Sequence, residues 1–340
     1  MTLEEVFENA KQHTRTCRVC RVCNGKACAG EIPGVGGKGT GSSFIRNAEA
    51  LKNVRLRMNV LTGLKKADPS ADFFGHNVSL PVYAAPITGM GPQYGSDITE
   101  KEYAKRVLEG ASAAGTYAFT GDGKDFSFFE DPFRLILAQN GEGIPTMKPW
   151  VKKGRDMRTD LLKEGRPIAF ATDIDAAGLL FLRDADPAIT NLSAEDLADL
   201  KKMLGTVPLI VKGIMTADAA KKAVEAGADG IVVSNHGGRV LDDAEGTIEV
   251  LPEIVNAVKG RCRILIDGAF RSGADVFKAL ALGADGVLIG RPVALAALGG
   301  NAEGVKLYFE KIRTELREAM TMCGASSVKE ISTSMVCVKK

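Results

Sequence analysis

One hexapeptide combines a base with a permanent cation. SNHGGR, at residues 234–239, directly follows the apolar run Gly230–Val233. The imidazole of His236 can take up a proton near neutral pH, and the guanidinium of Arg239 can hold a carboxylate through two parallel hydrogen bonds. The pair therefore suits proton abstraction from an anionic substrate. A turn with a hydrogen-bonded histidine ring is the structural alternative.

Charged residues also end other apolar runs of the chain. These runs supply Lys148, Asp173, Asp175, Lys212, Asp267 and Arg291. Lys212 lies within the apolar stretch 208–213, where a lone charge is costly to bury, so it requires a negative partner. Electrostatic stabilisation of a developing negative charge and Schiff-base chemistry both use such a lysine, and the sequence leaves the two open.

A phosphate-binding pattern follows the last two apolar runs. Asp267-Gly268 and Arg271 open one predicted helix, and Gly290-Arg291 opens the next segment. Glycines let backbone N–H groups approach an anion, a helix start adds a favourable dipole, and the arginines add charge. We expect a phosphorylated cofactor or substrate here, the alternative being arginines paired with surface acids.

The elements that position these residues alternate regularly from residue 81 onward. Short apolar runs lie at 81–86, 116–120, 144–148, 167–173, 208–213, 230–235, 263–268 and 286–291. Amphipathic stretches lie at 100–114, 127–140, 152–164, 194–204, 217–226, 248–259, 272–282 and 303–322. Eight strand–helix units predict an α/β protein with a (β/α)8 TIM barrel, whose active site lies at the carboxyl ends of the strands. A doubly wound open sheet is the second choice.

We divide the chain into an N-terminal extension (1–80), the barrel (81–325) and a C-terminal tail (326–340). The extension contains Cys17, Cys20, Cys23 and Cys28, a glycine-rich run at 33–43 and a hairpin pattern at 71–81. The glycine-rich run predicts a loop over the barrel mouth, and the hairpin is expected to cover the barrel bottom. The cysteine spacing is close to that of iron–sulfur and zinc sites, and reduced thiols without metal are the preferred interpretation over such a site.

Composition excludes several classes of protein. The chain has 340 residues, 45% hydrophobic and 25% charged, with a net charge of +2 and no long basic run. Neither nucleic acid nor a membrane is expected as a partner. The acidic, amphipathic start and the odd number of cysteines, seven, predict a cytoplasmic protein without a disulfide framework.

Several motifs together resemble the FMN-dependent α-hydroxy acid oxidase and dehydrogenase family, which includes glycolate oxidase, lactate oxidase and flavocytochrome b2. They are PVYAAPIT at 81–88, VKGI at 211–214, SNHGGR followed by Leu241-Asp242, Asp267-Gly268 with Arg271, DVFKALALGA at 275–284, and Gly290-Arg291-Pro292. The similarity is close over residues 205–325 and recognisable at 71–90.

The resemblance implies a role for each matching position. His236 would be the catalytic base, with Asp175 or Asp173 fixing its ring and Asp175 preferred, and Lys212 would stabilise reduced FMN. Arg239 would bind the substrate carboxylate. The implied flavin-binding residues are Pro86, Ile87, Thr88, Lys212, Ser234, Asp267, Gly268, Arg271, Gly290 and Arg291.

The chain also departs from the family pattern in the substrate pocket. The family's third strand carries Gln-x-Tyr, whereas Thr146-Met147-Lys148 stands in that register, so Lys148 would replace a substrate-binding hydroxyl. No match is found for the family's N-terminal tyrosine, and Arg183 is only a distant candidate for its second substrate arginine.

The expected function is oxidation of a lactate-like α-hydroxy acid by an FMN enzyme, with the proton passing to His236. The expected partners are the small 2-hydroxy acid substrate and other copies of the chain in a homo-oligomer, for which the resemblance implies a tetramer. The alternatives are an isomerase or reductase on the same barrel, similar to type 2 isopentenyl diphosphate isomerase, and a non-catalytic flavin or metal sensor.

Overall fold

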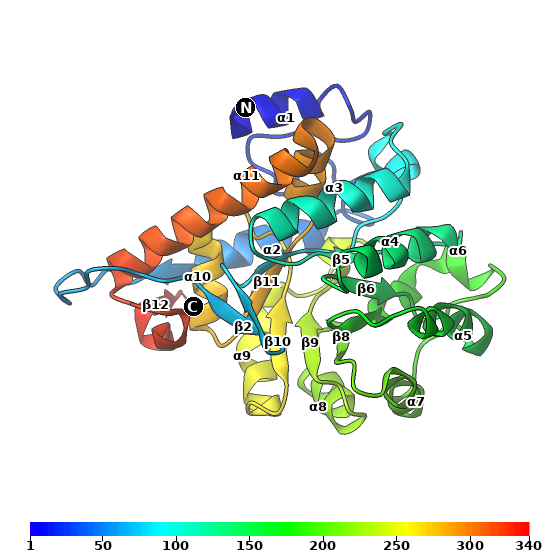
Figure 1. Ribbon diagram of the computed structural model, residues 1–340. Coiled ribbons are helices and arrows are strands. Elements are labelled where there is room, and N and C mark those ends of the chain that lie inside the picture. The colour runs from blue at the N-terminus through cyan, green and yellow to red at the C-terminus, as the bar shows by residue number, and fades with distance from the viewer. Residues whose placement is uncertain (340) are drawn as a thin grey trace.

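The computed structural model describes residues 1–339 and contains an eight-stranded parallel barrel (Figure 1). Its strands are β4 (Val82–Ala84), β5 (Phe119–Thr120), β6 (Ile144–Met147), β7 (Phe170–Asp173), β8 (Leu209–Ile214), β9 (Gly230–Val233), β10 (Arg263–Ile266) and β11 (Gly286–Ile289). They pair in chain order, β11 pairs with β4, and a parallel bridge between Ala84 and Ala118 closes the ring. The predicted TIM barrel is confirmed, and the open-sheet alternative is wrong.

Helices surround the barrel close to the predicted positions. They are α3 (Glu100–Ala113), α4 (Ser127–Ala138), α5 (Lys152–Thr159), α7 (Ala194–Leu204), α8 (Ala217–Glu225), α9 (Thr247–Val258), α10 (Gly273–Ala281) and α11 (Arg291–Cys323). The side chains of Thr99, Ser193, Thr216 and Ser272 cap four of them, which is why these helices begin where the sequence predicts. The backbone of α11 is non-helical at Asn301, so the predicted helix at 303–322 is its second half.

Inside the barrel, a layer of polar side chains lies above a layer of apolar ones, because inward and outward side chains alternate along each strand. The apolar layer inside the barrel includes Tyr83, Phe119, Ile144, Ala171, Ile210, Val232, Leu265 and Leu288. Because side chains on one face of a strand recur every second residue, the next inward positions include Asp173, Lys212, Ser234, Asp267 and Gly290. These charged residues therefore lie at the carboxyl end of the barrel.

The predicted hairpin closes the opposite end. It consists of β2 (Ala71–Phe73) and β3 (His76–Val78), and Phe73 packs on Tyr83 with ring centroids 4.6 Å apart. His76 lies in this hairpin with its ring edge-on to Tyr117, at the end of the barrel opposite the charged strand ends. Its placement agrees with a structural role.

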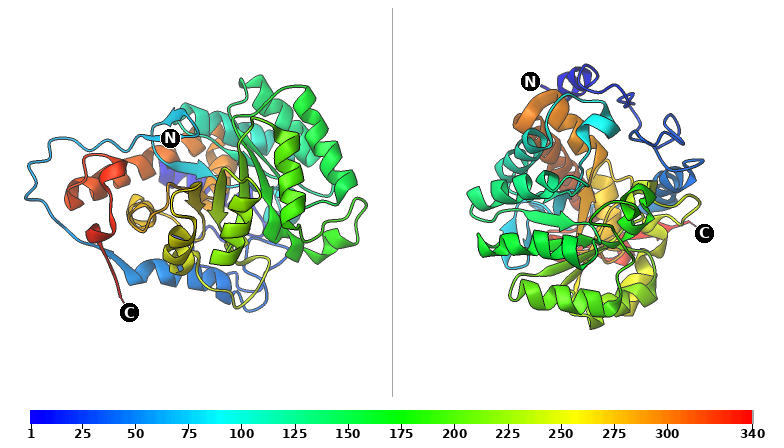
Figure 2. Two further views of the ribbon diagram at one scale, coloured as in Figure 1. Left: turned by 90° about the horizontal axis from the view of Figure 1, so that it is seen from below. Right: turned by 90° about the vertical axis from the view of Figure 1, so that its right-hand side faces the viewer.

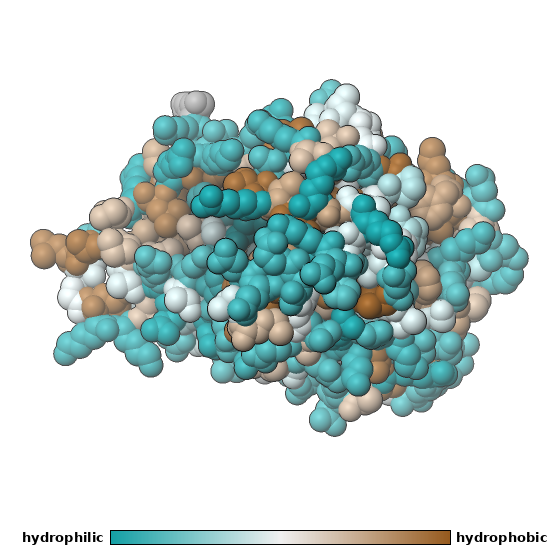
Figure 3. All heavy atoms as spheres, turned by 90° about the horizontal axis from the view of Figure 1, so that it is seen from above, coloured by the Kyte–Doolittle hydropathy of each residue, from teal (hydrophilic) through white to brown (hydrophobic). Residues whose placement is uncertain are grey.

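The extension and the tail are joined by a small sheet. β1 (Val54–Leu56) pairs with β12 (Val336–Val338), and two helices of the extension, α1 (Leu3–Ala10) and α2 (Ser42–Asn53), were not among the predicted elements. The segment between β1 and β2 extends away from the barrel (Figure 2). It exposes Met58, Val60 and Leu61, and brown surface marks that end of the molecule in Figure 3. Within residues 1–339, no helix has the length and apolar character to cross a membrane.

Candidate active site

A cavity of about 920 Å³ opens at the carboxyl ends of the barrel strands. Twelve of the predicted site residues line it: Pro86, Ile87, Thr88, Lys148, Lys212, His236, Arg239, Asp267, Gly268, Arg271, Gly290 and Arg291. Ser234, Asp173 and Asp175 contact these residues from the cavity wall. The structure therefore brings all of the predicted substrate and flavin positions together around one space.

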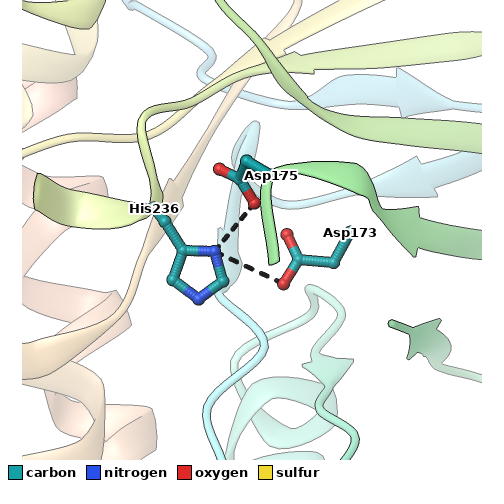
Figure 4. Close-up of side chains that lie close together, drawn as sticks. All are labelled: Asp173, Asp175 and His236. Atoms are coloured by element: carbon teal, nitrogen blue, oxygen red, sulfur yellow. Dashed lines mark hydrogen bonds and ion pairs between the residues drawn. The ribbon is translucent and has the colours of Figure 1, made fainter. Parts of the chain in front are cut away.

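His236 is held by a carboxylate. Its Nδ1 lies 2.8 Å from Oδ1 of Asp175 and 3.5 Å from Oδ2 of Asp173, as Figure 4 shows. Asp175 comes from a 3₁₀ turn (Ile174–Gly178) that directly follows β7. Because Asp175 occupies Nδ1, Nε2 is the nitrogen that can take up a proton. The geometry agrees with the preference for Asp175 over Asp173.

The backbone at the hexapeptide is strained. His236, Gly237 and Gly238 have φ angles of 57°, 63° and 78°, a left-handed conformation that is uncommon for histidine. A Cβ atom on Gly238 would lie 2.4 Å from the backbone N of Phe44, in α2. The two glycines thus permit a sharp turn and a close approach that aim the imidazole into the cavity.

Lys212 is buried among three carboxylates. Its Nζ lies 2.8 Å from Asp173, 3.9 Å from Asp175 and 3.8 Å from Asp267. Burial opposes the lysine charge, but these carboxylates together raise the pKa of Lys212 above its usual value. Burial likewise opposes ionisation of Asp173, yet Lys212, His236 and Lys148 hold its pKa below the usual range. A fixed ammonium therefore lies at the cavity floor.

Lys148 lines the cavity and belongs to the same charge cluster. Its Nζ lies 4.0 Å from Oδ2 of Asp173, and its side chain is only 12% exposed.

Asp173, Asp175 and His236 also form a group of three donors close enough to hold a metal ion. Because the Lys212 ammonium already lies against both carboxylates, a second cation there would meet strong repulsion. We therefore favour a hydrogen-bonded histidine over a metal centre.

Two arginines contact the glycine-rich run from the cavity. Arg291 donates from Nε to Val35 O at 2.7 Å, and its guanidinium stacks 3.8 Å above the Phe44 ring. Arg239 donates from Nη1 to Gly34 O at 2.7 Å. Burial first, and then the charge of Arg291, lowers the pKa of Arg239 to about 10, so Arg239 stays cationic at neutral pH. The run lies at the barrel mouth, where the sequence placed it.

Sequence reasoning missed residues that support the site from distant elements. Asn47 of α2 exchanges side-chain hydrogen bonds of 2.8 and 3.1 Å with Asn235, and so ties α2 to the hexapeptide. Tyr94, at the end of a short π-helical turn (Met90–Tyr94), is buried and lines the cavity. Tyr94 follows the first barrel strand, and its position in that loop is the signal that could have identified it.

A buried ion pair supports the loop that carries Lys148. Asp122 accepts two hydrogen bonds from Arg158, at 2.7 and 2.8 Å, one from Trp150 and one from the backbone N of Lys148. All the side chains of this network are almost completely buried. The spacing of these residues in the sequence does not predict that Arg158 of α5 contacts Asp122 after the end of β5.

The four clustered cysteines are free thiols. Among the described residues, no three of them have sulfur atoms within 4.8 Å of one another. Cys23 Sγ lies 3.5 Å from Nη2 of Arg271, so the cysteine segment contacts the arginine end of the cavity. Metal binding by these residues stays a prediction.

Comparison with known proteins identifies the family. The family model for FMN-dependent dehydrogenases matches residues 35–122 and 159–338, more than half of the chain. The chain belongs to this family. It is 32% identical to glycolate oxidase of Spinacia oleracea, covering 86% of this chain and 87% of the relative. It is 33% identical to L-lactate oxidase of Lactobacillus jensenii, covering 84% and 75%. A crystal structure of mandelate oxidase superposes with a TM-score of 0.76 at 27% identity, covering 96% of each chain.

FMN is the cofactor of this FMN-dependent dehydrogenase, and the cavity has the groups to hold it. Oδ1 of Asp267 and Nε of Arg271 are buried and have no hydrogen-bond partner within the protein. Buried polar atoms are normally hydrogen-bonded, so Asp267 Oδ1 and Arg271 Nε are available to bond ligand groups such as hydroxyl and phosphate. Gly268 has φ of 109°, and a Cβ atom there would lie 2.5 Å from Thr247 Oγ1. Because Gly268 has no side chain, its backbone stays accessible beside Asp267 and Arg271.

Proposed function

We propose that this chain uses FMN to oxidise a small α-hydroxy acid to the α-keto acid, with His236 as the base. The observation that carries the proposal is the His236–Asp175 hydrogen bond of 2.8 Å beside Arg239 and Lys212 in one cavity. Bound FMN would accept the two electrons that leave the substrate in this oxidation, while the base takes one proton. Membership of the FMN-dependent dehydrogenase family supports the cofactor and the reaction type.

Each charged side chain of the cavity has a separate role in this reaction. Arg239 binds the substrate carboxylate and thereby orients the α-carbon toward His236, whose Nε2 takes the proton. Asp175 keeps the ring in one tautomer and stabilises the imidazolium that forms. Lys212 offsets the negative charge that FMN gains, and Lys148 supplies a second cation to the substrate side.

The substrate is a 2-hydroxy acid of lactate-like size or somewhat larger. Relatives of the chain are named for glycolate, L-lactate and 4-hydroxymandelate. Phe128, Phe181 and Leu182 line the cavity together with Lys148, so an apolar substituent would find contacts there. A panel of glycolate, lactate, 2-hydroxybutyrate and mandelate tests the range.

The isomerase alternative is not favoured, because the relatives are hydroxy acid oxidases. The sensor alternative differs from the proposal in a simple way. A sensor would contain FMN that no hydroxy acid reduces, whereas the enzyme's flavin absorbance bleaches when substrate is added without oxygen.

The first prediction concerns His236. Loss of the general base in His236→Gln should slow anaerobic flavin reduction by about 10²- to 10⁴-fold while FMN content stays unchanged. Stopped-flow absorbance with the best acid of the panel measures the rate. His76→Gln, at the barrel bottom, is the matched control and should reduce at the wild-type rate. Normal reduction in His236→Gln would remove His236 from the role of base.

We further infer a homo-oligomer, with the tetramer that the family resemblance implies, and a cytoplasmic location. Light scattering of the purified holoenzyme tests the first, and cell fractionation tests the second. Neither inference affects the assignment of the cavity.

A further inference from the structure

The cysteine segment is unusual in length and position. Residues 11–41, between α1 and α2, contain no helix or strand apart from a single bridge between Ala29 and Gly37. Long irregular segments within compact proteins are usually functional, and a cross-link often fixes their shape. Residues 1–34 lie outside the family match, so the shared flavin chemistry does not account for the cysteines.

The four thiols lie in one neighbourhood. Cys17 lies within electrostatic range of Cys20, Cys23 and Cys28. Cys28 likewise lies within electrostatic range of Cys20 and Cys23. Cys17, Cys23 and Cys28 are half-buried, whereas Cys20 is exposed. Thiols gathered in this way bind a metal once they are deprotonated.

Two hydrogen-bond donors point at sulfur atoms in this segment. The backbone N of Val19 lies 3.4 Å from Cys17 Sγ, and Nη2 of Arg271 lies 3.5 Å from Cys23 Sγ. Val19 has φ of 46°, a strained angle for a β-branched residue, and it lies between Cys17 and Cys20. N–H groups directed at thiolate sulfurs orient and stabilise metal ligands.

Basic residues lie within and beside the segment. Arg18, Arg21 and Lys26 belong to it, and Arg291 lies within electrostatic range of Cys28. Arg18 also forms two hydrogen bonds of 2.6 and 2.7 Å with Glu31, which closes the segment around the cysteines. Cations of this kind favour thiolates over thiols.

We propose that Cys17, Cys20, Cys23 and Cys28 bind an iron–sulfur cluster of the [4Fe–4S] type beside Arg271. Their C-x2-C-x2-C spacing matches the start of the bacterial ferredoxin run, although the fourth cysteine follows at a longer interval. A single zinc ion would hold its sulfur ligands about 3.8 Å apart, given tetrahedral bonds of about 2.3 Å. No three of these sulfurs approach within 4.8 Å among the described residues, and a four-iron cluster separates its ligands more widely.

The test is metal and sulfide analysis of the full-length protein. We would produce it without oxygen in cells supplied with iron, and measure iron, zinc, acid-labile sulfide and FMN per chain. We expect about four iron atoms and about four sulfide ions. Cryogenic EPR after dithionite reduction should add the signal of a reduced cluster. Cys20→Ser and Cys23→Ser should each lose at least 90% of the iron, whereas Cys337→Ser, an exposed cysteine of the tail, should retain it.

Three results would overturn the proposal. They are FMN-loaded wild-type protein without iron, one zinc per chain in place of iron, and iron that both cysteine variants retain. FMN content reports folding in every variant. If Cys23→Ser also loses FMN because Cys23 contacts Arg271, the iron content of Cys20→Ser decides the outcome. Cys20 is exposed, and within residues 1–339 no hydrogen bond to Arg271 is found for it. The result does not depend on hydroxy acid turnover, so the proposed function is tested separately.

Discussion

At the scale of single residues, the substrate side of the pocket combines two departures from the family pattern. By the sequence resemblance, Lys148 stands where the family carries a tyrosine, and the fourth strand ends in two carboxylates, Asp173 and Asp175, where the family has Thr-x-Asp. Oδ2 of Asp173 lies 4.0 Å from Nζ of Lys148 and 3.5 Å from Nδ1 of His236. A buried cation needs a counter-charge, so the two changes compensate each other. Residues 123–158, which contain Lys148, also fall in the gap of the family match. Substrate choice is therefore expected to differ most from the relatives here.

The prediction at this position is that Lys148→Met weakens catalysis without removing FMN. Loss of a charge-assisted hydrogen bond costs about 1.5–3 kcal/mol, so kcat/KM should fall about 10- to 100-fold. Steady-state kinetics with the acid that bleaches the flavin measures this. Lys124→Met is the matched control, because Lys124 lines the same cavity but is exposed. Equal kcat/KM in both variants would show that Lys148 does not touch the substrate.

Site residues were predictable from the sequence where they end a strand. Lys212, Ser234 and Asp267 lie two residues beyond apolar inward positions, so the strand period alone directs them to the cavity. Asn47 and Arg158 were not predictable, because only the folded barrel brings α2 to Asn235 and α5 to the end of β5. Their partners lie 188 and 36 residues away in the sequence, and no local pattern records such contacts.

At the scale of elements, the glycine-rich run is anchored by Asp242. Its carboxylate accepts hydrogen bonds from the backbone N of Thr40 at 2.6 Å and of Ser42 at 3.1 Å. The sequence predicts a loop at 33–43 from its glycines but does not reveal α2 behind it. Gly41 precedes α2 with φ of 76° and provides no side-chain cap, so the usual signal of a helix start is missing.

Asp242→Ala should loosen this run over the cavity. Amide hydrogen exchange at Thr40 and Ser42 should become about tenfold faster, because their acceptor is lost. Mass-spectrometric exchange of the holoenzyme measures the change. Asp243→Ala is the control, since Asp243 accepts only a longer bond of 3.3 Å from Ser42 Oγ. Unchanged exchange in Asp242→Ala would mean that the run is held by its arginine contacts instead.

The same anchor has a defined pH dependence. The backbone N–H of Thr40, ahead of the other hydrogen bonds, lowers the pKa of Asp242 from 3.8 to about 2. A carboxylate with a depressed pKa contributes its stabilisation fully above the unfolded value and loses it as the pH falls through the folded value. The anchor should therefore be intact at neutral pH. Loss of protection at the Thr40 amide, relative to its intrinsic exchange rate at the same pH, should appear only as the pH approaches about 2.

At the scale of the whole molecule, the N-terminal extension and the C-terminal tail meet outside the barrel at β1 and β12. β12 pairs with β1 at three positions, from Val54 opposite Val338 to Leu56 opposite Val336, and Arg57 N donates to Met335 O. The barrel could be predicted because its units repeat in sequence. This pairing could not, since two three-residue strands nearly a chain length apart carry no periodic signal.

Ending the chain at Met335 should lower stability while leaving the active site intact. The truncation removes the three residue pairs between β1 and β12 and exposes the buried side chain of Val54, which should cost about 2–4 kcal/mol. For a chain of this length the loss corresponds to a fall of roughly 3–6 °C in Tm. Calorimetry of the FMN-loaded protein measures it, and Cys337→Ser, which preserves the pairing, should melt like wild type. Loss of FMN together with stability would instead show that the β1–β12 sheet positions α2 and, through Asn47, the hexapeptide.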